Sequence, residues 1–321
     1  MAGRKRAAKR PRKAIPAVLS ALLVLAALLV YYYEPELQSA FQKPAAGPVS
    51  DTAVESEAEV YFFDVGQGDS VLVRVGDYTM LVDAGTRASG DRIEENLAAL
   101  GVTELDAVVA THPHADHIGA MAQIVGDYPI ETFYMPVLPD SQTPTTATYE
   151  QMLDALSERE VHVVRITEKT EIPAPENAAF QVLSPRAADE FGDVNDYSAV
   201  IRFTYGEVSF LLTGDAETPV EEILLDSGAE LSAEVLKCGH HGSSSSTSAA
   251  FLRAVNPAVA VISCGADNDY GHPHAETLEA LGASGCMVMR TDEDGTVAVV
   301  TDGEAYAVHT WSAAEGFSPA A

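Results

Sequence analysis

The sequence predicts an α/β protein, a four-layer helix–sheet–sheet–helix sandwich preceded by one transmembrane helix. Short apolar segments rich in β-branched residues recur between Gly-containing turns, which is typical of strands, and segments with helical periodicity separate many of them. The order is repeated, because each half of residues 58–312 begins with successive strands and continues with alternating strands and helices. Two such halves favour two sheets that pack face to face, with helices on the outer faces.

The N-terminal residues predict a membrane anchor. Residues 1–14 form a basic tail, whereas residues 15–33 are apolar and contain no charged residue. Such a run is about long enough to span a bilayer as a helix, and the basic flank favours a cytoplasmic N-terminus with the C-terminal domain outside the cell. A cleaved signal peptide is the alternative, although its apolar region is usually shorter and no clear cleavage site follows. Residues 34–57 contain Pro, Ser and Ala and indicate a linker.

The first half of the folded domain is expected to hold six strands and three helices. The expected strands are the apolar segments 59–63, 70–75, 78–83, 105–110, 133–135 and 161–166. The expected helices are 89–101, 118–126 and 149–158. In the first of these helices, Ile93 and Leu97 share one face and Gly101 is a typical end signal.

The second half repeats this organisation with further strands and helices. The expected strands are 180–185, 198–205, 208–214, 233–239, 257–264, 287–291 and 296–303. The expected helices are 219–228, 251–255 and 275–285. Residues 313–321 are expected to form a C-terminal tail.

The charge argues against a broad nucleic-acid-binding face, and the cysteine content argues against a disulfide framework. The net charge is −29, and residues 1–50 carry eight Lys or Arg and two acidic residues, so the rest of the chain carries about −35. Such a domain repels a long polyanion and does not offer a broad nucleic-acid-binding face. The three cysteines, Cys238, Cys264 and Cys286, are odd in number and lie in or beside apolar segments, so we expect core residues and no disulfide framework.

Seven of the nine histidines fall in three short loops, each after an apolar strand-like segment. In the first loop, Pro113 favours an extended backbone at His112, and residues two apart in an extended segment face the same way, so His112 and His114 can face one ion. Asp116 and His117 begin the next helix and can serve a second ion or a bound water. Imidazole and carboxylate ligands without thiolate suit Zn²⁺, Mn²⁺ or Fe.

The loop THPHADH, residues 111–117, resembles the H-x-H-x-D-H signature of the metallo-β-lactamase fold, which is the sandwich inferred above. LLTGDAE with Asp215 resembles the later aspartate motif of that superfamily, and LVDAG with Asp83 its early aspartate. Four further stretches, in order from about residue 59 to 302, resemble the hydrolase domain of ComEC-type competence proteins and their stand-alone relatives. These stretches are FFDVGQGDS, NDYSAVIRF, LKCGHHGSSSS and YGHPH.

The resemblance implies a site for two divalent metal ions, Zn²⁺ or Mn²⁺. The ligands of the first ion would be His112, His114 and Asp215. The ligands of the second ion would be Asp116, His117, Asp215 and His241. Asp215 would bridge the two ions, since a carboxylate can offer one oxygen to each, and Asp83 would support the histidine loop from behind the ligands.

Further residues are expected to act on substrate. His240 precedes His241 and cannot easily enter the same coordination sphere, so we expect it to contact a substrate phosphate or to protonate a leaving group. Asp116 and His272 are the other candidate catalytic residues, His272 being either a further ligand or a substrate contact. The remaining histidines, His162, His274 and His309, are expected to be structural.

The broader superfamily usually has a lone histidine between the two aspartate motifs, and here the corresponding stretch is DVNDYSAV. This difference leaves the shell of the first metal ion open for substrate. Asn195 and Ser198 are therefore candidate substrate contacts. Asn195 or Asp196 could also coordinate the first ion weakly, or these residues could equally form a turn before a strand. We expect the DVGQGDS loop at the rim of the site, with Asp69 as a third candidate substrate contact.

The leading hypothesis is a membrane-anchored extracellular hydrolase that cleaves a phosphodiester, in a nucleic acid or a cell-envelope polymer, with a metal-activated water. No obligate protein partner is evident from the sequence. One alternative is a hydrolase of carboxylic esters, lactones or β-lactams that uses the same metals. Another is a metal-binding surface module without turnover.

Overall fold

The computed structural model describes residue 54 and residues 56–320, and within them it confirms the α/β sandwich. The predicted basic tail and transmembrane helix lie outside the described residues. Among the helices of residues 56–320, none is long and apolar enough to cross a membrane.

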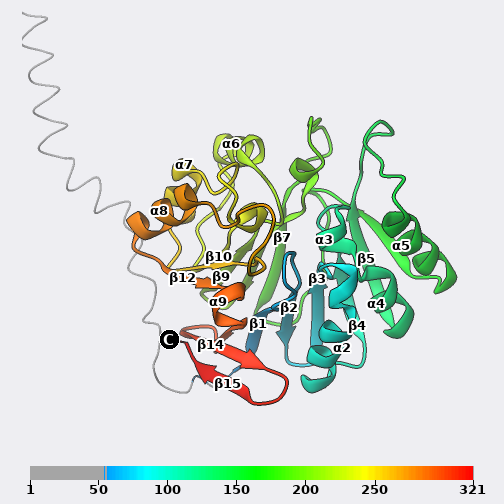
Figure 1. The fold of residues 1–321 in the computed structure, drawn as a ribbon, viewed down its shortest axis with the longest axis horizontal. Helices are drawn as coiled ribbons and strands as arrows, with labels where there is room; N and C mark the ends of the chain where they lie inside the picture. Colours follow the sequence, from blue (N-terminus) through cyan, green and yellow to red (C-terminus); the bar gives the residue numbers. More distant parts are fainter. Residues whose placement is uncertain (1–53, 55, 321) are drawn as a thin grey trace, which may run out of the picture. The chain divides into compact units, whose positions relative to one another are not determined.

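The first sheet has nine strands, and strands from both ends of the domain meet in it (Figure 1). In spatial order these are β15 (Gly316–Pro319), β14 (Tyr306–Ser312), β13 (Thr296–Thr301), β1 (Ala58–Phe62), β2 (Val71–Val75), β3 (Tyr78–Val82), β4 (Leu105–Val109), β5 (Ile130–Pro136) and β6 (His162–Ile166). Strands β3 to β6 are parallel and the other pairs antiparallel. Residues 316–319, which lie in the predicted C-terminal tail, form strand β15 because they pair with β14.

The second sheet has six strands, which are antiparallel at one end of the sheet and parallel at the other. In spatial order they are β12 (Met287–Arg290), β11 (Val259–Ile262), β10 (Val235–Lys237), β9 (Val208–Leu212), β8 (Val200–Tyr205) and β7 (Ala178–Ser184). Strands β9 to β12 are parallel, and helical connections join them because parallel neighbours cannot be linked by a tight turn.

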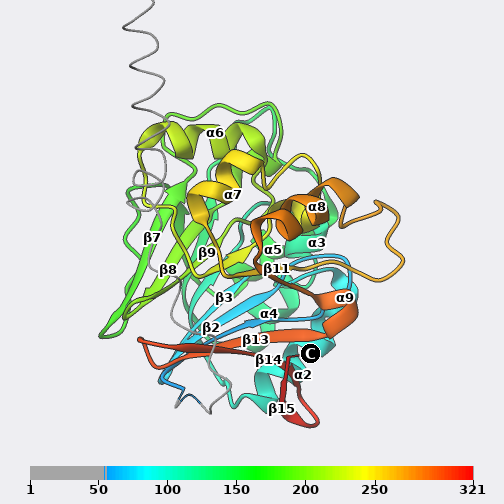
Figure 2. The same cartoon turned by 90° about the vertical axis from the view of Figure 1, so that its left-hand side faces the viewer.

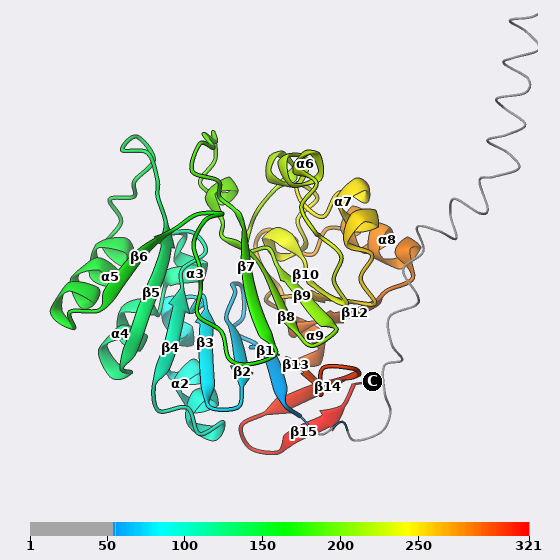
Figure 3. The ribbon, with the colours of Figure 1, turned by 180° about the vertical axis from the view of Figure 1, so that it is seen from behind.

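Helices cover the outer face of each sheet (Figures 1 and 3). The first sheet carries α2 (Gly90–Ala99), α3 (Ala115–Ile118), α4 (Met121–Asp127) and α5 (Ala147–Glu158). The second carries α6 (Thr218–Ser227), α7 (Ala249–Val255) and α8 (Ala275–Ser284), and a short helix α9 (Thr291–Asp294) leads into β13. Each helical layer buries its own apolar cluster, for example Ile93 and Leu97 of α2, and Val220 and Leu224 of α6.

The two sheets face each other, as the turned view shows (Figure 2), and aromatic side chains pack between them. The ring of Tyr78 in the first sheet lies 5.8 Å from that of Phe180 in the second, and Phe203 continues the contact at 4.9 Å from Phe180. The described cysteines are free, and Cys238 and Cys264 are buried in the core as expected.

The segments predicted to carry chemistry gather at one edge of the sandwich. Strands β3, β4, β9, β10 and β11 all end there, and the loops that follow them contain Asp83, the first histidine loop, Asp215, the 240–241 pair and the 264–274 segment. The carboxyl ends of parallel strands are where ligand sites assemble in α/β sheets, since the chain must leave the sheet at the same edge each time.

Candidate metal centre

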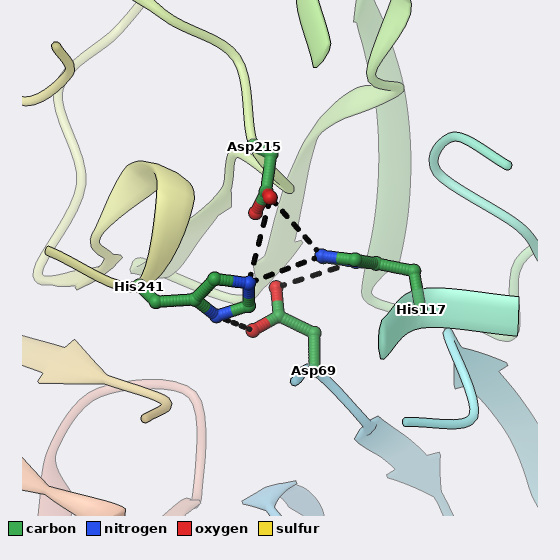
Figure 4. Close-up of side chains that lie close together, drawn as sticks. All are labelled: Asp69, His117, Asp215 and His241. Atoms are coloured by element: carbon green, nitrogen blue, oxygen red, sulfur yellow. Dashed lines mark hydrogen bonds and ion pairs between the residues drawn. The ribbon is translucent and has the colours of Figure 1, made fainter. Parts of the chain in front are cut away.

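Three buried histidines point one ring nitrogen at the same carboxylate oxygen. The Nε2 atoms of His112, His117 and His241 lie 3.8, 3.2 and 3.4 Å from Oδ2 of Asp215. Figure 4 shows the approach of two of these rings, His117 and His241, to Asp215. Three imidazoles that converge on one carboxylate oxygen in a buried site form a typical ligand set for a divalent ion.

The other ring nitrogen of each histidine is held by a partner behind the site. His117 Nδ1 lies 2.7 Å from Oδ2 of Asp83, and His241 Nδ1 lies 2.9 Å from the carbonyl oxygen of Ser263. His112 Nδ1 lies 3.3 Å from Ser198 Oγ. Such outer partners set the tautomer and the ring orientation of metal-ligating histidines, so the structure places Asp83 where the sequence predicted a supporting carboxylate.

The distances around His241 fit one tetrahedral ion. Its Nε2 lies 3.3 Å from His117 Nε2 and 3.3 Å from Asp116 Oδ2. A tetrahedral zinc site with bonds of about 2.0–2.1 Å has ligand atoms roughly 3.3 Å apart. His117, His241 and Asp215 are therefore mutually spaced as ligands of one ion, and Asp116 approaches the same nitrogen of His241. These are the four residues that the resemblance implies for the second ion.

The remaining ligands form a more open group. His112 Nε2 lies 3.1 Å from His114 Nδ1, and His114 is exposed while His112 is fully buried. With Asp215 they supply three ligand atoms, and His112 Nε2 is farther from Asp215 than the other two imidazoles are. The first ion would thus have a shell with a free position towards solvent, the arrangement of a catalytic site.

The electrostatics of the cluster favour a cation. Burial alone would lower the pKa of His117, but the carboxylates of Asp215 and Asp83 outweigh it and raise that pKa to about 10. Burial is likewise outweighed at His241, where Asp215 and Asp69 raise the pKa well above its usual range. The same carboxylates that attract protons to these rings would attract a divalent ion, which would displace the protons on binding.

Two close backbone approaches require glycine next to the ligands. Gly68 has φ +146°, and a Cβ there would lie 2.3 Å from the carbonyl oxygen of Asp116. Gly214 has φ +52°, and a Cβ there would press on Thr111 and Ser198 at 3.0–3.1 Å. These glycines let the DVGQGDS and LLTGDAE loops pack directly against the histidine loop.

Asp69 and Lys237 form a buried ion pair beneath the site. The Lys237 ammonium contacts Oδ2 of Asp69 and donates a hydrogen bond to the carbonyl oxygen of Gly214 at 3.1 Å. Asp69 is 3% exposed, and its Oδ1 lies 3.3 Å from His241 Nδ1, the nitrogen that faces away from Asp215. The prediction of Asp69 as a substrate contact at the rim is therefore wrong, because the side chain points inward to Lys237.

Asp69 also lies close enough to the cluster to be considered as a ligand. One potential ligand atom from each of four residues lies within 4.8 Å of the other three, and these residues are Asp69, His117, Asp215 and His241. It approaches the Nδ1 side of both rings (Figure 4), whereas Asp116 approaches the Nε2 side of His241. We therefore assign the ligand position to Asp116 and a supporting position to Asp69.

A cleft of about 370 Å³ opens over the cluster. It is lined by Gln67, His114, Ala115, Asp116, Asn195, Asp215, His240, His241, Tyr270 and His272. The candidate catalytic residues Asp116, His240 and His272 and the candidate substrate contact Asn195 thus all face it. His274, His162 and His309 do not line it; His274 starts α8 and accepts a hydrogen bond from the backbone N–H of Ser244.

His240 lies nearer to the cluster than the sequence suggested. Its Nε2 is 3.8 Å from Oδ2 of Asp215, because His240 and His241 both have positive φ, 46° and 53°, which turns both rings towards the same carboxylate. Its Nδ1 lies 2.8 Å from Oε1 of Glu217. A carboxylate that orients a histidine at the wall of a cleft is an arrangement suited to proton transfer.

Ser198 does not reach the cleft, so its prediction as a substrate contact is wrong. It is fully buried, and its Oγ accepts a hydrogen bond from the backbone N–H of Asp215 at 3.1 Å. Ser198 therefore holds Asp215 and His112 in place. The carboxylate of Asp196 is used by the backbone, since its Oδ1 accepts a hydrogen bond from the N–H of Glu217 at 3.2 Å.

Lys237 and Glu217 are site residues that the sequence reasoning did not single out. Both lie within stretches already noted, LKCGHH and LLTGDAE. A lysine inside an otherwise apolar strand was the available signal for Lys237, since a buried ammonium requires an anionic partner.

The fold and this cluster together define the class of metal-dependent hydrolases. Residues 63–266 match the family described as the Metallo-beta-lactamase superfamily, and the chain belongs to it. The CmlA beta-hydroxylase shares the fold with a TM-score of 0.50, at 13% identity over 78% of this chain and 55% of that chain.

Two curated relatives place the chain more narrowly, beside the ComEC-type competence proteins. ComE operon protein 3 of Bacillus subtilis (strain 168) is 32% identical over 76% of this chain and 33% of its own length. Competence protein ComA of Neisseria gonorrhoeae is 35% identical over 76% of this chain and 32% of its own length. The chain thus matches about one third of each relative.

Proposed function

We propose that this protein is a phosphodiesterase that uses two divalent ions, Zn²⁺ or Mn²⁺. The observation that carries the proposal is the position of Asp215 Oδ2, which lies within 3.8 Å of an Nε2 atom of His112, His117 and His241 and so belongs to both ligand groups. Bound there, the ions would lower the pKa of water towards neutrality and offset negative charge at the attacked phosphorus. Asp215 would fix the spacing between them.

His240 would protonate the leaving oxygen. It lines the cleft beside the ligands, and Glu217 holds its Nδ1, so Nε2 is left to face a substrate. Ser245 Oγ donates a hydrogen bond to the same Glu217 oxygen at 2.7 Å, which fixes the carboxylate. A positioned histidine of this kind accelerates proton transfer by typically 10²–10⁴-fold.

The substrate class that we propose is a nucleic acid or a nucleotide diester, with a cell-envelope diester as the other possibility within the same chemistry. Relatives of this chain are named for competence and one for recombination, and these processes handle DNA. The charge of about −35 carried by residues 51–321 disfavours a long contact with a polyanion. A short segment in the cleft meets less of that repulsion.

The location that we propose comes from residues 1–33 alone. The basic tail followed by an uncharged apolar run supports a single membrane anchor with the catalytic domain on the extracellular side.

A substrate panel tests the proposal. The protein is loaded with Zn²⁺ or Mn²⁺ and offered bis-p-nitrophenyl phosphate, single-stranded DNA, an envelope-polymer fragment and nitrocefin. We expect metal-dependent cleavage of the phosphodiesters that EDTA abolishes. Cleavage of nitrocefin alone would overturn the proposal in favour of a β-lactam hydrolase, and metal binding without turnover of any substrate would indicate a binding module.

A second prediction concerns the leaving group. His240→Gln should lower kcat on DNA by about 10²-fold or more, and should affect bis-p-nitrophenyl phosphate much less, because nitrophenolate leaves as a stable anion without protonation. Metal content, measured by elemental analysis, should stay at the wild-type value. Exposed His162 offers a matched control, since His162→Gln should change neither rate. Equal losses on both substrates would show that His240 does not act as the acid.

A further inference from the structure

One exposed aromatic ring stands at the mouth of the cleft. Tyr270 is 67% exposed, more than any other large apolar residue among those the structure describes. Its ring lies 5.6 Å from that of His272 at an angle of 19°, so the two rings are nearly parallel. Because this ring also lines the cleft, it is placed to contact a ligand there.

The loop that carries Tyr270 is held in place by its own hydrogen bonds. The side-chain oxygen of Asn268 accepts from the backbone N–H of Tyr270 at 3.1 Å and of His272 at 3.0 Å. Its amide nitrogen donates to the carbonyl oxygen of Gly265 at 2.9 Å. These bonds use backbone groups at positions 270 and 272, so the ring of Tyr270 contributes nothing to them and is free to contact a ligand.

Four buried polar atoms of cleft-lining side chains have no hydrogen-bond partner within the described part of the chain. One is Oδ1 of Asp215, a candidate metal ligand; the other three are Nε2 of Gln67, Oδ1 of Asn195 and Nδ1 of His272. Gln67 is fixed, because its Oε1 accepts from the backbone N–H of Gly265 at 3.1 Å, and its free amide is therefore a donor for a ligand. Asn195 is only 6% exposed, and an unpaired polar atom at such depth is costly unless a ligand or water satisfies it.

The cleft lacks the cationic side chains that bind a phosphate backbone. Among the described residues, neither Lys nor Arg lines it. Apart from the candidate metal ligands and the two histidines His240 and His272, its lining offers the ring of Tyr270 and the neutral amides of Gln67 and Asn195. These groups suit a nucleobase, since stacking of an unpaired base on an aromatic side chain contributes about 1–3 kcal/mol.

We propose that Tyr270 is a stacking platform for one unpaired base of a single-stranded nucleic acid, next to the phosphodiester that is cut. The proposal rests on the phosphodiesterase function above and names its substrate class. The base lies on the free face of Tyr270, and Gln67 and Asn195 hydrogen-bond to the nucleotide. A duplex cannot use this platform, because its bases are already stacked.

Binding of base-containing and abasic strands tests the platform apart from turnover. The probes are fluorescently labelled short oligothymidylates with hydrolysis-resistant phosphorothioate linkages and abasic strands of the same backbone, measured by anisotropy with Mn²⁺. We expect wild type to prefer the base-containing strand, and Tyr270→Ala to reduce that preference roughly 10- to 100-fold, as for the loss of one stacked base. Tyr270→Phe should keep most of it, since the ring remains.

A second exposed aromatic residue provides the control. Phe317 in β15 is 45% exposed and does not line the cleft, so Phe317→Ala should leave the preference unchanged. Elemental analysis of each variant checks that the metal site is intact. Equal binding of both strands by wild type, or an undiminished preference in Tyr270→Ala, would overturn the platform.

The outcomes also separate this inference from the proposed function. Base-dependent binding without cleavage of DNA would remove the phosphodiesterase function and leave the platform standing. Cleavage of abasic and base-containing DNA at equal rates would overturn the platform and leave the phosphodiesterase function standing. Competition by phosphocholine that is stronger than that of thymidine 5′-monophosphate would assign the ring to a quaternary ammonium, which also binds aromatic faces, and would overturn the nucleobase assignment.

Discussion

Asp215→Ala is expected to abolish phosphodiester hydrolysis and to reduce metal content towards zero. Asp215 Oδ2 is the shared neighbour of His112, His117 and His241, at 3.2–3.8 Å from their Nε2 atoms. On the proposed two-ion site, removing it would delete one ligand from each ion and leave the buried imidazoles without a shared carboxylate. Because both ions would depend on Asp215, we expect kcat/KM to fall by about 10³-fold or more, beyond the loss of a single stabilising group.

The measurement combines kinetics on bis-p-nitrophenyl phosphate with elemental analysis of metal per chain. Asp215→Asn keeps the shape of the side chain and checks that the effect comes from the charge. Asp64→Asn is the matched control, since Asp64 lies in the DVGQGDS loop but pairs with the exposed Arg92 at 3.1 Å. Wild-type metal stoichiometry in Asp215→Ala would show that Asp215 does not bridge the ions.

The sequence predicted most strands and helices because their apolar periodicity is strong. Segments such as 105–110 and 208–214 are largely apolar and bounded by turns, and they form the buried strands β4 and β9. Strand β15 was missed because Gly316–Pro319 is short and half exposed, so its identity depends on pairing with β14 rather than on its own composition.

The side chains that converge at the candidate metal centre could be predicted because short motifs at strand ends carry them. His112, His114 and His117 lie within one loop, and Asp215 and His241 follow strands β9 and β10, which are hydrogen-bonded neighbours in the second sheet. Because these two strands are neighbours, Asp215 and His241 lie close together. The packing of the two sheets then places both residues beside the first histidine loop.

The supporting residues could not be predicted to the same extent, because their roles depend on contacts between distant parts of the chain. Asp69 looks like a turn residue in its own loop, and only its contact with Lys237 shows that it is buried. Ser198 looks like a substrate contact beside Asn195, yet its hydroxyl is used by the backbone of Asp215. His240 reaches the cluster through positive φ angles, which side-chain patterns do not reveal.

The buried pair of Lys237 and Asp69 leads to the second large prediction, which concerns stability. Burial would lower the pKa of Lys237, but Asp69 and Asp215 outweigh it and raise that pKa, so the ammonium is charged. Lys237→Met would leave the carboxylate of Asp69 buried without its cation. Breaking such a pair typically costs about 3–5 kcal/mol, and we expect a loss of this size in the free energy of unfolding.

Urea unfolding with EDTA present, so that bound metal does not contribute, measures this loss. Lys169→Met is the control, since Lys169 is an exposed lysine 3.9 Å from Glu168 and should change stability little.

Replacing both partners tests the pair itself, because Asp69→Asn combined with Lys237→Met removes both charges. The double variant should recover much of the stability lost by Lys237→Met, and it remains measurable if the single variant does not fold. A double variant as unstable as the sum of the two single changes would show that the residues do not act as a pair. The two charges would then support the site independently, Lys237 through the carbonyl of Gly214 and Asp69 through the ring of His241.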